Sequence, residues 1–133
     1  MVTTDRVEGT LIVDKANPKD VFGEAKVHLG LLPAAGKIHG ALAMQSGSKK
    51  YGPYNWRESN VRMTIYLDAI ERHLLALRDG EDLAQDSGVS HLGHIISSAS
   101  IILDAQATNT LIDDRPPAGP CAKILKEYTQ NRE

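Results

Sequence analysis

Residues 62–79, RMTIYLDAIERHLLALRD, decide the fold of this 133-residue chain. Their large apolar side chains recur every three or four positions, which places them on one stripe of an α-helix. Gly80 follows directly and supplies a helix stop. The pattern predicts an amphipathic helix over residues 62–79 whose stripe faces a helical core. The stripe consists of Met63, Tyr66, Leu67, Ile70, Leu74 and Leu77.

Apolar residues at helical spacing also occur on both sides of this segment. Upstream they predict a helix over residues 31–47, in which Pro33 is tolerated because it lies in the first turn. Downstream, Ser90 is a candidate N-cap for a helix over residues 91–108. Isoleucines and leucines surround most of that last helix, which predicts a central position in the fold or a surface for self-association.

The expected fold class is mainly all-α: a compact helical bundle of three to four helices with an extended N-terminal arm. Glycines, a β-branched run and Asn17-Pro18 predict that residues 1–30 form the arm. Residues 31–112 are expected to form the helical core domain. Residues 113–133 are expected to form a proline-rich turn and a short C-terminal helix over residues 121–129.

The composition is typical of one globular domain, with 41% hydrophobic and 24% charged residues. The 15 basic and 17 acidic residues give a formal charge of -2, which provides no bulk attraction for duplex nucleic acid. A lone cysteine, Cys121, forms no intramolecular disulfide and fits a reducing compartment. No stretch is as long and apolar as a membrane helix. We expect a cytoplasmic protein without a membrane or duplex partner.

Three histidines are predicted to point inward from two of the helices. On a helical wheel His73 lies on the apolar stripe of residues 62–79, and His91 and His94 share an apolar arc of the next helix. The three imidazoles are therefore predicted to converge, where they would carry protons or bind a metal. The alternative is that they are core residues whose ring nitrogens bond to the backbone, serines or acids.

Five carboxylates near these histidines are candidate metal ligands. Asp68 and Glu71 are one helical turn apart, which suits a shared magnesium or manganese ion beside a phosphate. Because their helix face is polar, a solvated surface with ion pairs is the alternative. The acidic turn between the two helices adds Glu81, Asp82 and Asp86.

Residues 49–57, KKYGPYNWR, combine three positive charges with three of the six aromatic residues in the chain. The breakers within residues 46–60 predict a loop. Its cations can neutralise phosphates, its aromatic faces can stack on a base and its asparagine can read a base edge. Alternatively, the aromatic residues seal one end of the core. The candidate nucleotide-binding residues are Lys49, Lys50, Tyr51, Tyr54, Asn55, Trp56 and Arg57.

Several motifs together resemble a known family. They are KYGPYNWR at 50–57, YLDA at 66–69, RHLL at 72–75, DGED at 79–82, DSG at 86–88 and HLGH at 91–94, with NPKD at 17–20 upstream and DDRPP at 113–117 downstream. This set is similar to phage and prophage proteins described as dATP/dGTP diphosphohydrolase, N-terminal domain. The similarity covers most of the chain.

The resemblance implies hydrolysis of a purine deoxynucleoside triphosphate to its monophosphate and pyrophosphate, which would adjust the nucleotide pool in the host cytoplasm. A divalent ion, magnesium or manganese, would hold the phosphates and activate water. Under this hypothesis the candidate catalytic residues are His73, Asp82 and His94. The candidate metal ligands are Asp68, Glu71, Glu81, Asp82, Asp86, His91 and His94.

The family is distantly similar to MazG-like pyrophosphohydrolases, all-α oligomers that hold magnesium with Glu-x-x-Glu and Glu-x-x-Asp pairs. This chain departs from their pattern, because its first long helix has Lys37 and His39 where acids would be wanted. Only Asp68 with Glu71 forms a comparable pair. The likeness and the apolar helix over residues 91–108 predict a homo-oligomer.

Two other functions fit the same residues. A small-nucleotide binder would sequester a nucleotide-derived signal, such as a host defence messenger, without turnover and without a metal. A structural or assembly module would use the histidines only to specify packing.

Overall fold

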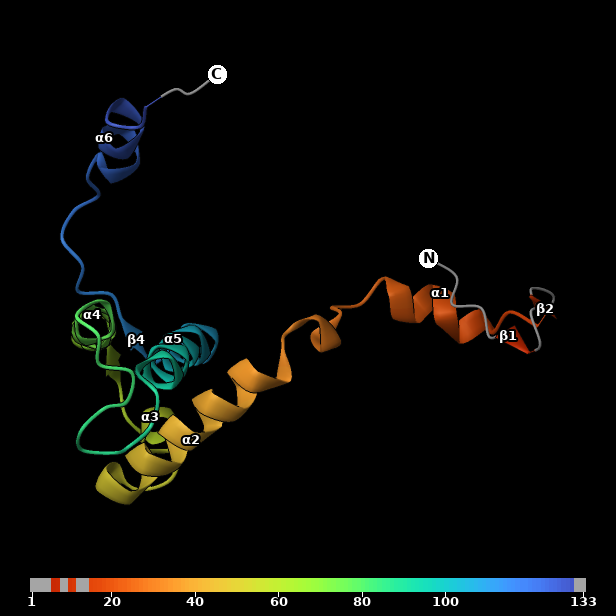
Figure 1. The fold of residues 1–133 in the computed structure, drawn as a ribbon, viewed down its shortest axis with the longest axis horizontal. Helices are drawn as coiled ribbons and strands as arrows, with labels where there is room; N and C mark the ends of the chain where they lie inside the picture. The colour runs from red at the N-terminus through yellow and green to blue at the C-terminus, as the bar shows by residue number, and fades with distance from the viewer. Residues whose placement is uncertain (1–5, 8–9, 12–14, 131–133) are drawn as a thin grey trace. The chain divides into compact units, whose positions relative to one another are not determined.

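The computed structural model describes residues 6–7, 10–11 and 15–130. The chain divides into two compact units, residues 1–33 and residues 34–133. Figure 1 shows the second unit as a group of helices in which α2, α4 and α5 are the longest. The prediction of a mainly helical protein is confirmed. No described helix combines the length and hydropathy that a membrane span requires.

The described residues of the first unit form short elements. Strand β1 (Arg6–Val7) pairs antiparallel with β2 (Thr10–Leu11), and α1 (Pro18–Glu24) and a 3-10 turn, η1 (Leu29–Leu31), follow. Within the expected arm, α1 stands where turns were expected. The Asn17 side chain accepts the backbone N–H of Lys19 at 3.0 Å, so Asn17-Pro18 starts a helix rather than a turn. Residues 1–5, 8–9 and 12–14 of the predicted arm lie outside the described residues.

In the second unit, α5 (His91–Ala107) packs against both α2 (Ala34–Tyr51) and α4 (Met63–Arg78). Its buried residues are His91, Gly93, Ser97, Ile102 and Ala105. The predicted central position of this helix is confirmed. The predicted bounds of α4 and α5 are also confirmed to within one residue at each end. Ser90 caps α5 as predicted, since its side chain accepts the backbone N–H of Leu92 at 3.2 Å.

The loop predicted over residues 46–60 is largely helical, because α2 continues to Tyr51 and α3 covers Asn55–Glu58. Lys49 and Lys50 lie in the last turn of α2, where positive charge interacts favourably with the helix dipole. The helix stops at Gly52, whose φ of 86° is accessible to glycine at little cost. The lysines and Tyr51 are therefore held on a helix and not on a loop.

Short segments complete this unit. Strand β3 (Val61–Arg62) pairs in parallel with β4 (Leu111–Ile112), which joins the start of α4 to the chain that follows α5. Asp114 caps α4 by accepting the Thr64 backbone N–H at 2.8 Å. The last helix, α6, covers Cys121–Glu127, within the predicted range of 121–129.

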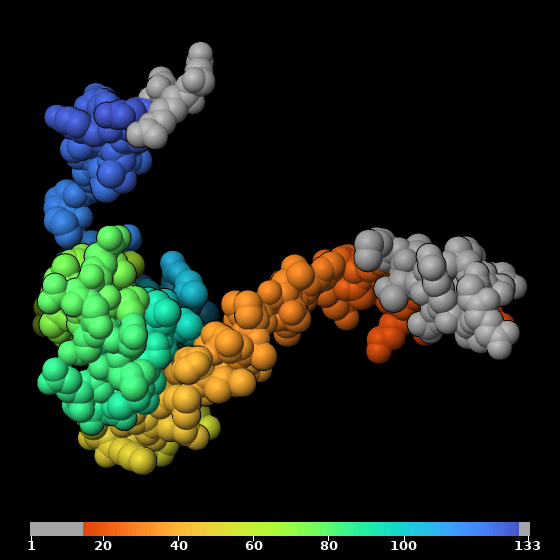
Figure 2. All heavy atoms as spheres, viewed as in Figure 1, coloured from red at the N-terminus to blue at the C-terminus, as the bar shows by residue number. Residues whose placement is uncertain are grey.

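The core between the helices is built from small residues. Its buried apolar side chains are Ala43, Val61, Ala84, Ile102 and Ala105. Gly93 of α5 lies so close to α2 that an added Cβ would stand 2.5 Å from the His39 carbonyl oxygen. In the space-filling view, the yellow end of α2 touches the green and teal surface of the segments that follow it (Figure 2). These close approaches hold α2 and α4 against α5.

Candidate functional site

A pocket of about 400 Å³ opens beside α2, α3, α4 and α5 in the second unit. This volume lies within the range of small-molecule sites in proteins. The polar side chains that line it come from all four helices and from the connection after α4. They are Ser46, Ser48, Lys50, Asn55, Arg72, His73, Asp86, His94, Ser97 and Ser98, and the aromatic lining residues are Tyr51, Trp56 and Tyr66.

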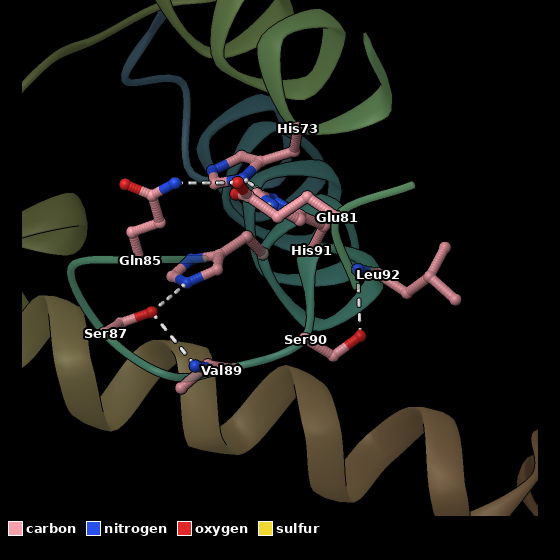
Figure 3. A network of polar contacts seen from close by, with 9 residues as sticks. His73, Glu81, Gln85, Ser87, Val89, Ser90, His91 and Leu92 are labelled. Atoms are coloured by element: carbon pink, nitrogen blue, oxygen red, sulfur yellow. Dashed lines mark hydrogen bonds and ion pairs between the residues drawn. The ribbon is translucent and has the colours of Figure 1, made fainter. Parts of the chain in front are cut away.

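The three predicted histidines meet at one wall of this pocket. Nδ1 of His73 lies 2.8 Å from Nδ1 of His91, within hydrogen-bonding distance. The His73 ring also stacks on the His94 ring, with centroids 4.5 Å apart and planes 2° from parallel. Figure 3 shows His73 and His91 directed toward each other from α4 and α5. The predicted convergence of the imidazoles is confirmed.

A carboxylate continues the histidine chain on the side away from His73. Nε2 of His91 and Oε1 of Glu81 are 2.8 Å apart, and Gln85 donates to the other Glu81 oxygen at 3.0 Å (Figure 3). His91 is only 4% exposed, so its two ring nitrogens depend on His73 and Glu81 for hydrogen bonding. Glu81, His91 and His73 therefore form one continuous hydrogen-bonded chain.

The connection over residues 79–90 positions the acidic and hydroxyl partners. It folds back on itself through an antiparallel bridge between Leu83 and Ser90. Its Ser87 hydroxyl lies 2.8 Å from Nε2 of His94 and accepts the Val89 backbone N–H at 3.2 Å. The closed shape of this connection keeps Glu81 and Ser87 beside the histidines of α5.

Burial lowers the pKa of both histidines that line the pocket. For His73 the neighbouring imidazoles of His94 and His91 lower the pKa further, because a second positive charge there would be repelled. For His94 burial is also the largest cause of the lowered pKa. Both rings are consequently neutral at neutral pH and can accept a proton.

We expect the free energy of unfolding to decrease as the pH falls below about 6.5, the ordinary pKa of histidine. Unfolded His73 and His94 regain that pKa and bind protons first, so the unfolded state gains protons that the folded state resists. Urea unfolding at several pH values between about 7.5 and 5 measures how steeply the free energy of unfolding changes with pH. His94→Asn should flatten it, and an unchanged slope in that variant would contradict the assignment.

Lys50 forms an ion pair at the pocket rim. Its Nζ lies 2.7 Å from Oδ2 of Asp86, and this contact lowers the pKa of the Asp86 carboxyl and raises that of the lysine. Both side chains are largely exposed. The ion pair is therefore weak and exchangeable, as surface pairs usually are.

The structure divides the predicted nucleotide-binding residues into two groups. Lys50, Tyr51, Asn55 and Trp56 line the pocket. Of the others, Arg57 donates to both Asp104 oxygens at 2.9 and 2.6 Å. Lys49, Tyr54 and Arg57 do not line the pocket.

The structure also divides the predicted metal ligands. Glu81, Asp86, His91 and His94 lie in or directly behind the pocket wall. Asp68 and Glu71 line a separate groove on α4 that includes Asp113 and Arg115. Asp82 is exposed and contributes its backbone carbonyl, which accepts the His91 N–H at 3.0 Å. The seven predicted ligands thus do not meet at one point.

Several pocket residues were absent from the predicted set. Tyr66 precedes His73 by two helical turns and was placed on the same inward stripe, but it was counted as a core residue and not as a site residue. Arg72 is one of several cations in the chain, and no periodicity distinguishes it from a surface cation. The serines of α2 and α5 carry no sequence signal of their own, because serine is common on helix surfaces.

Fold and pocket together define a mainly helical protein with a polar, aromatic-lined pocket. Residues 16–115 match the model of the family described as dATP/dGTP diphosphohydrolase, N-terminal, and the chain belongs to this family. A relative from Salmonella phage PMBT28, named dATP/dGTP diphosphohydrolase, is 29% identical over 94 residues. The match covers 71% of this chain and 32% of the relative, so it spans about a third of that protein's length. No solved structure matches the chain.

Proposed function

We propose that the pocket binds a purine deoxynucleoside triphosphate and hydrolyses it to the monophosphate and pyrophosphate. The observation that carries the proposal is that cations, aromatic rings and a neutral imidazole line one pocket of suitable size. The family description and the name of the phage relative support the substrate class.

Lys50 and Arg72 would hold the phosphates, since they reach the pocket from two different helices. Arginine can bind two phosphate oxygens in parallel, whereas lysine acts as a point charge. A phosphate would compete with Asp86 for the Lys50 ammonium, and the exposed ion pair offers little resistance to that exchange.

Tyr51 and Trp56 would contact the base. Stacking of a base on an aromatic ring contributes about 1–3 kcal/mol. Asn55 lies in the same lining and can hydrogen-bond to a purine edge.

In the proposed reaction the oxygen of a water molecule bonds to the α-phosphorus while the bond from that phosphorus to the pyrophosphate oxygen breaks. The attacking water must lose a proton. His73 lies in the pocket wall with its pKa lowered by burial, so at neutral pH its ring can take that proton. A positioned base of this kind contributes about 10²–10⁴-fold to the rate.

A divalent ion is part of the proposed reaction. Within the described residues no three His, Cys, Asp or Glu side chains are arranged to hold one ion, and Asp86 is the one carboxylate in the pocket lining. This donor set fits an ion that arrives with the triphosphate, because magnesium often binds one or two carboxylates plus substrate phosphates. Asp86 would hold it there. The ion would neutralise phosphate charge and acidify bound water.

The test is incubation of the pure chain with separate deoxynucleoside triphosphates, with and without manganese, followed by chromatography of the products. The proposal predicts metal-dependent formation of monophosphate and pyrophosphate from dATP or dGTP. Release of inorganic phosphate instead would show cleavage of a different bond. No product with any triphosphate would contradict hydrolysis.

Lys50→Met is expected to weaken nucleotide binding about tenfold, because one charge-assisted contact with a phosphate is lost. Lys49→Met removes the same charge from the preceding residue, which does not line the pocket, and should change the dissociation constant less than threefold. Calorimetric titration with a triphosphate measures the dissociation constants of both variants. Equal losses in the two variants would assign the effect to long-range attraction and not to the pocket.

Nucleotide capture without turnover is the second candidate function. It is favoured by the single carboxylate in the pocket lining, because a binder needs no ion. Incubation with cyclic and ADP-ribose-type nucleotides, followed by denaturation and recovery of the intact ligand, would identify it. In this function the histidines would hydrogen-bond to the ligand.

Self-association is a further part of the proposed function. Leu75 of α4 and Leu103 of α5 are 66% and 65% exposed, although both belong to helices that form the core. Large exposed leucines at such positions favour packing against a second copy. Light scattering behind size exclusion should give a mass above that of the monomer, and Leu103→Glu should reduce it.

A further inference from the structure

We infer that Glu81 and His91 hold His73 in one tautomer, with the proton on Nδ1 and an open lone pair on Nε2 facing the pocket. Glu81 and His91 are then positioning residues for the base. The role of His73 as a base rests on the proposed function. The positions of the protons on the ring nitrogens of His73 and His91 do not.

The order of the protons starts at the carboxylate. An ionised Glu81 can only accept hydrogen bonds, and the bond from His91 is the main reason that the pKa of its carboxyl is lowered. Gln85 already donates to Oε2. The contact of 2.8 Å at Oε1 therefore requires a proton on Nε2 of His91.

The proton on His91 Nε2 decides the next contact. When the His91 imidazole is neutral, its one proton is the one on Nε2, so Nδ1 has a lone pair and accepts. The partner at 2.8 Å is Nδ1 of His73, which must then donate. One proton lies between the two rings, and it belongs to His73.

The remaining nitrogen of His73 is Nε2, which consequently has no proton when the ring is neutral. It forms no hydrogen bond with any described residue. No buried side-chain nitrogen or oxygen in the described chain lacks a partner, so this atom must be reached by solvent. His73 lines the pocket, and we infer that this lone pair faces it.

The hydrogen bonds from Glu81 through His91 to His73 also stabilise the protonated form of His73. When Nε2 takes a proton from water, His73 becomes an imidazolium that still donates through Nδ1 to His91. The Glu81 charge lies one imidazole away and partly neutralises the new positive charge. The stacked His94 ring fixes the plane of His73 but opposes a second positive charge.

Heteronuclear NMR of the imidazole nitrogens in the full chain, at about pH 8 where free histidine is neutral, tests the inference. We expect His73 to be protonated at Nδ1 and His91 at Nε2. A His73 ring protonated at Nε2 would overturn the inference. This measurement needs no variant, so it stands even where a substitution prevents folding.

Glu81→Gln supplies the matched functional test. It should reduce turnover at least about tenfold, leave the nucleotide dissociation constant within about twofold, and shift the acidic limb of the pH–rate profile to lower pH. A purely structural role would not move that limb. Asp79→Asn removes an exposed charge that is close in sequence but outside the Glu81–His91–His73 hydrogen bonds, and it should change none of these three quantities.

The outcomes separate the inference from the proposed function. The expected tautomers without turnover of any nucleotide would leave the order of protons intact and contradict the proposed hydrolysis. The opposite tautomer with full turnover would contradict the inference alone. An unchanged pH–rate profile in Glu81→Gln would contradict the positioning role of the carboxylate.

Discussion

His73→Asn is expected to lower nucleotide turnover by about a hundredfold or more, while the affinity for the nucleotide changes less than about threefold. Loss of a positioned general base typically lowers the rate by about 10²–10⁴-fold. Asparagine retains one polar group near His91 but has no basic nitrogen to accept a proton from water. The selective loss of turnover is the signature of a group that acts in the transition state.

Single-turnover kinetics and a separate binding titration measure the two quantities. His28→Asn is the control, since His28 is an exposed histidine of the first unit and does not line the pocket. Circular dichroism of both variants shows whether the helices are retained. Turnover within a few fold of the original in a folded His73→Asn variant would exclude His73 as the base.

Gly93→Ala is expected to destabilise the second unit by about 2–3 kcal/mol, even though alanine is the better helix former by about 1 kcal/mol. The new Cβ would stand 2.5 Å from the His39 carbonyl oxygen and 3.0 Å from its carbonyl carbon. These are backbone atoms of α2, so neither can move without shifting the whole helix. Steric overlap therefore outweighs helix propensity at this position.

Two glycines of α2 give the comparison for Gly93. A Cβ on Gly40 would meet Cγ2 of Ile96 at 2.8 Å, and a side chain can shift more easily than a helix backbone, so Gly40→Ala should cost less. Gly47 has nothing within 4 Å, and Gly47→Ala should stabilise by about 0.5–1 kcal/mol. Urea unfolding measures the free energy of unfolding of all three variants. A stabilising Gly93→Ala would show that α2 and α5 are not packed this closely.

The helices themselves were predictable because their signals are local. The apolar stripe over residues 62–79 and the Ser90 cap act within a few turns, and the helix and its neighbour's cap were found as expected, although Leu74 of the stripe is 39% exposed. The C-terminal end of α2 was not predicted, because from the sequence alone Gly47 and Gly52 are equally good candidates for ending the helix. Gly47 lies inside the helix while Gly52 ends it at positive φ.

The convergence of the histidines was predictable for the same reason, since two amphipathic helices that share a core must bring their inward faces together. Their hydrogen bonds were not. Helical spacing cannot show that Glu81 contacts His91, or that Lys50 lines the pocket while Lys49 does not. Such differences depend on the rotation and separation of packed helices.

By itself, the sequence determined the class of fold, the inward direction of His73, His91 and His94, and the family to which the chain belongs. Periodicity and motifs carry that information along the chain. Only the tertiary structure decided which polar side chains share one pocket and which ring nitrogen of His73 stays open. The physical reason is that hydrogen bonds depend on distances of a few tenths of an ångström, which are set by the packing of helices across glycines and alanines.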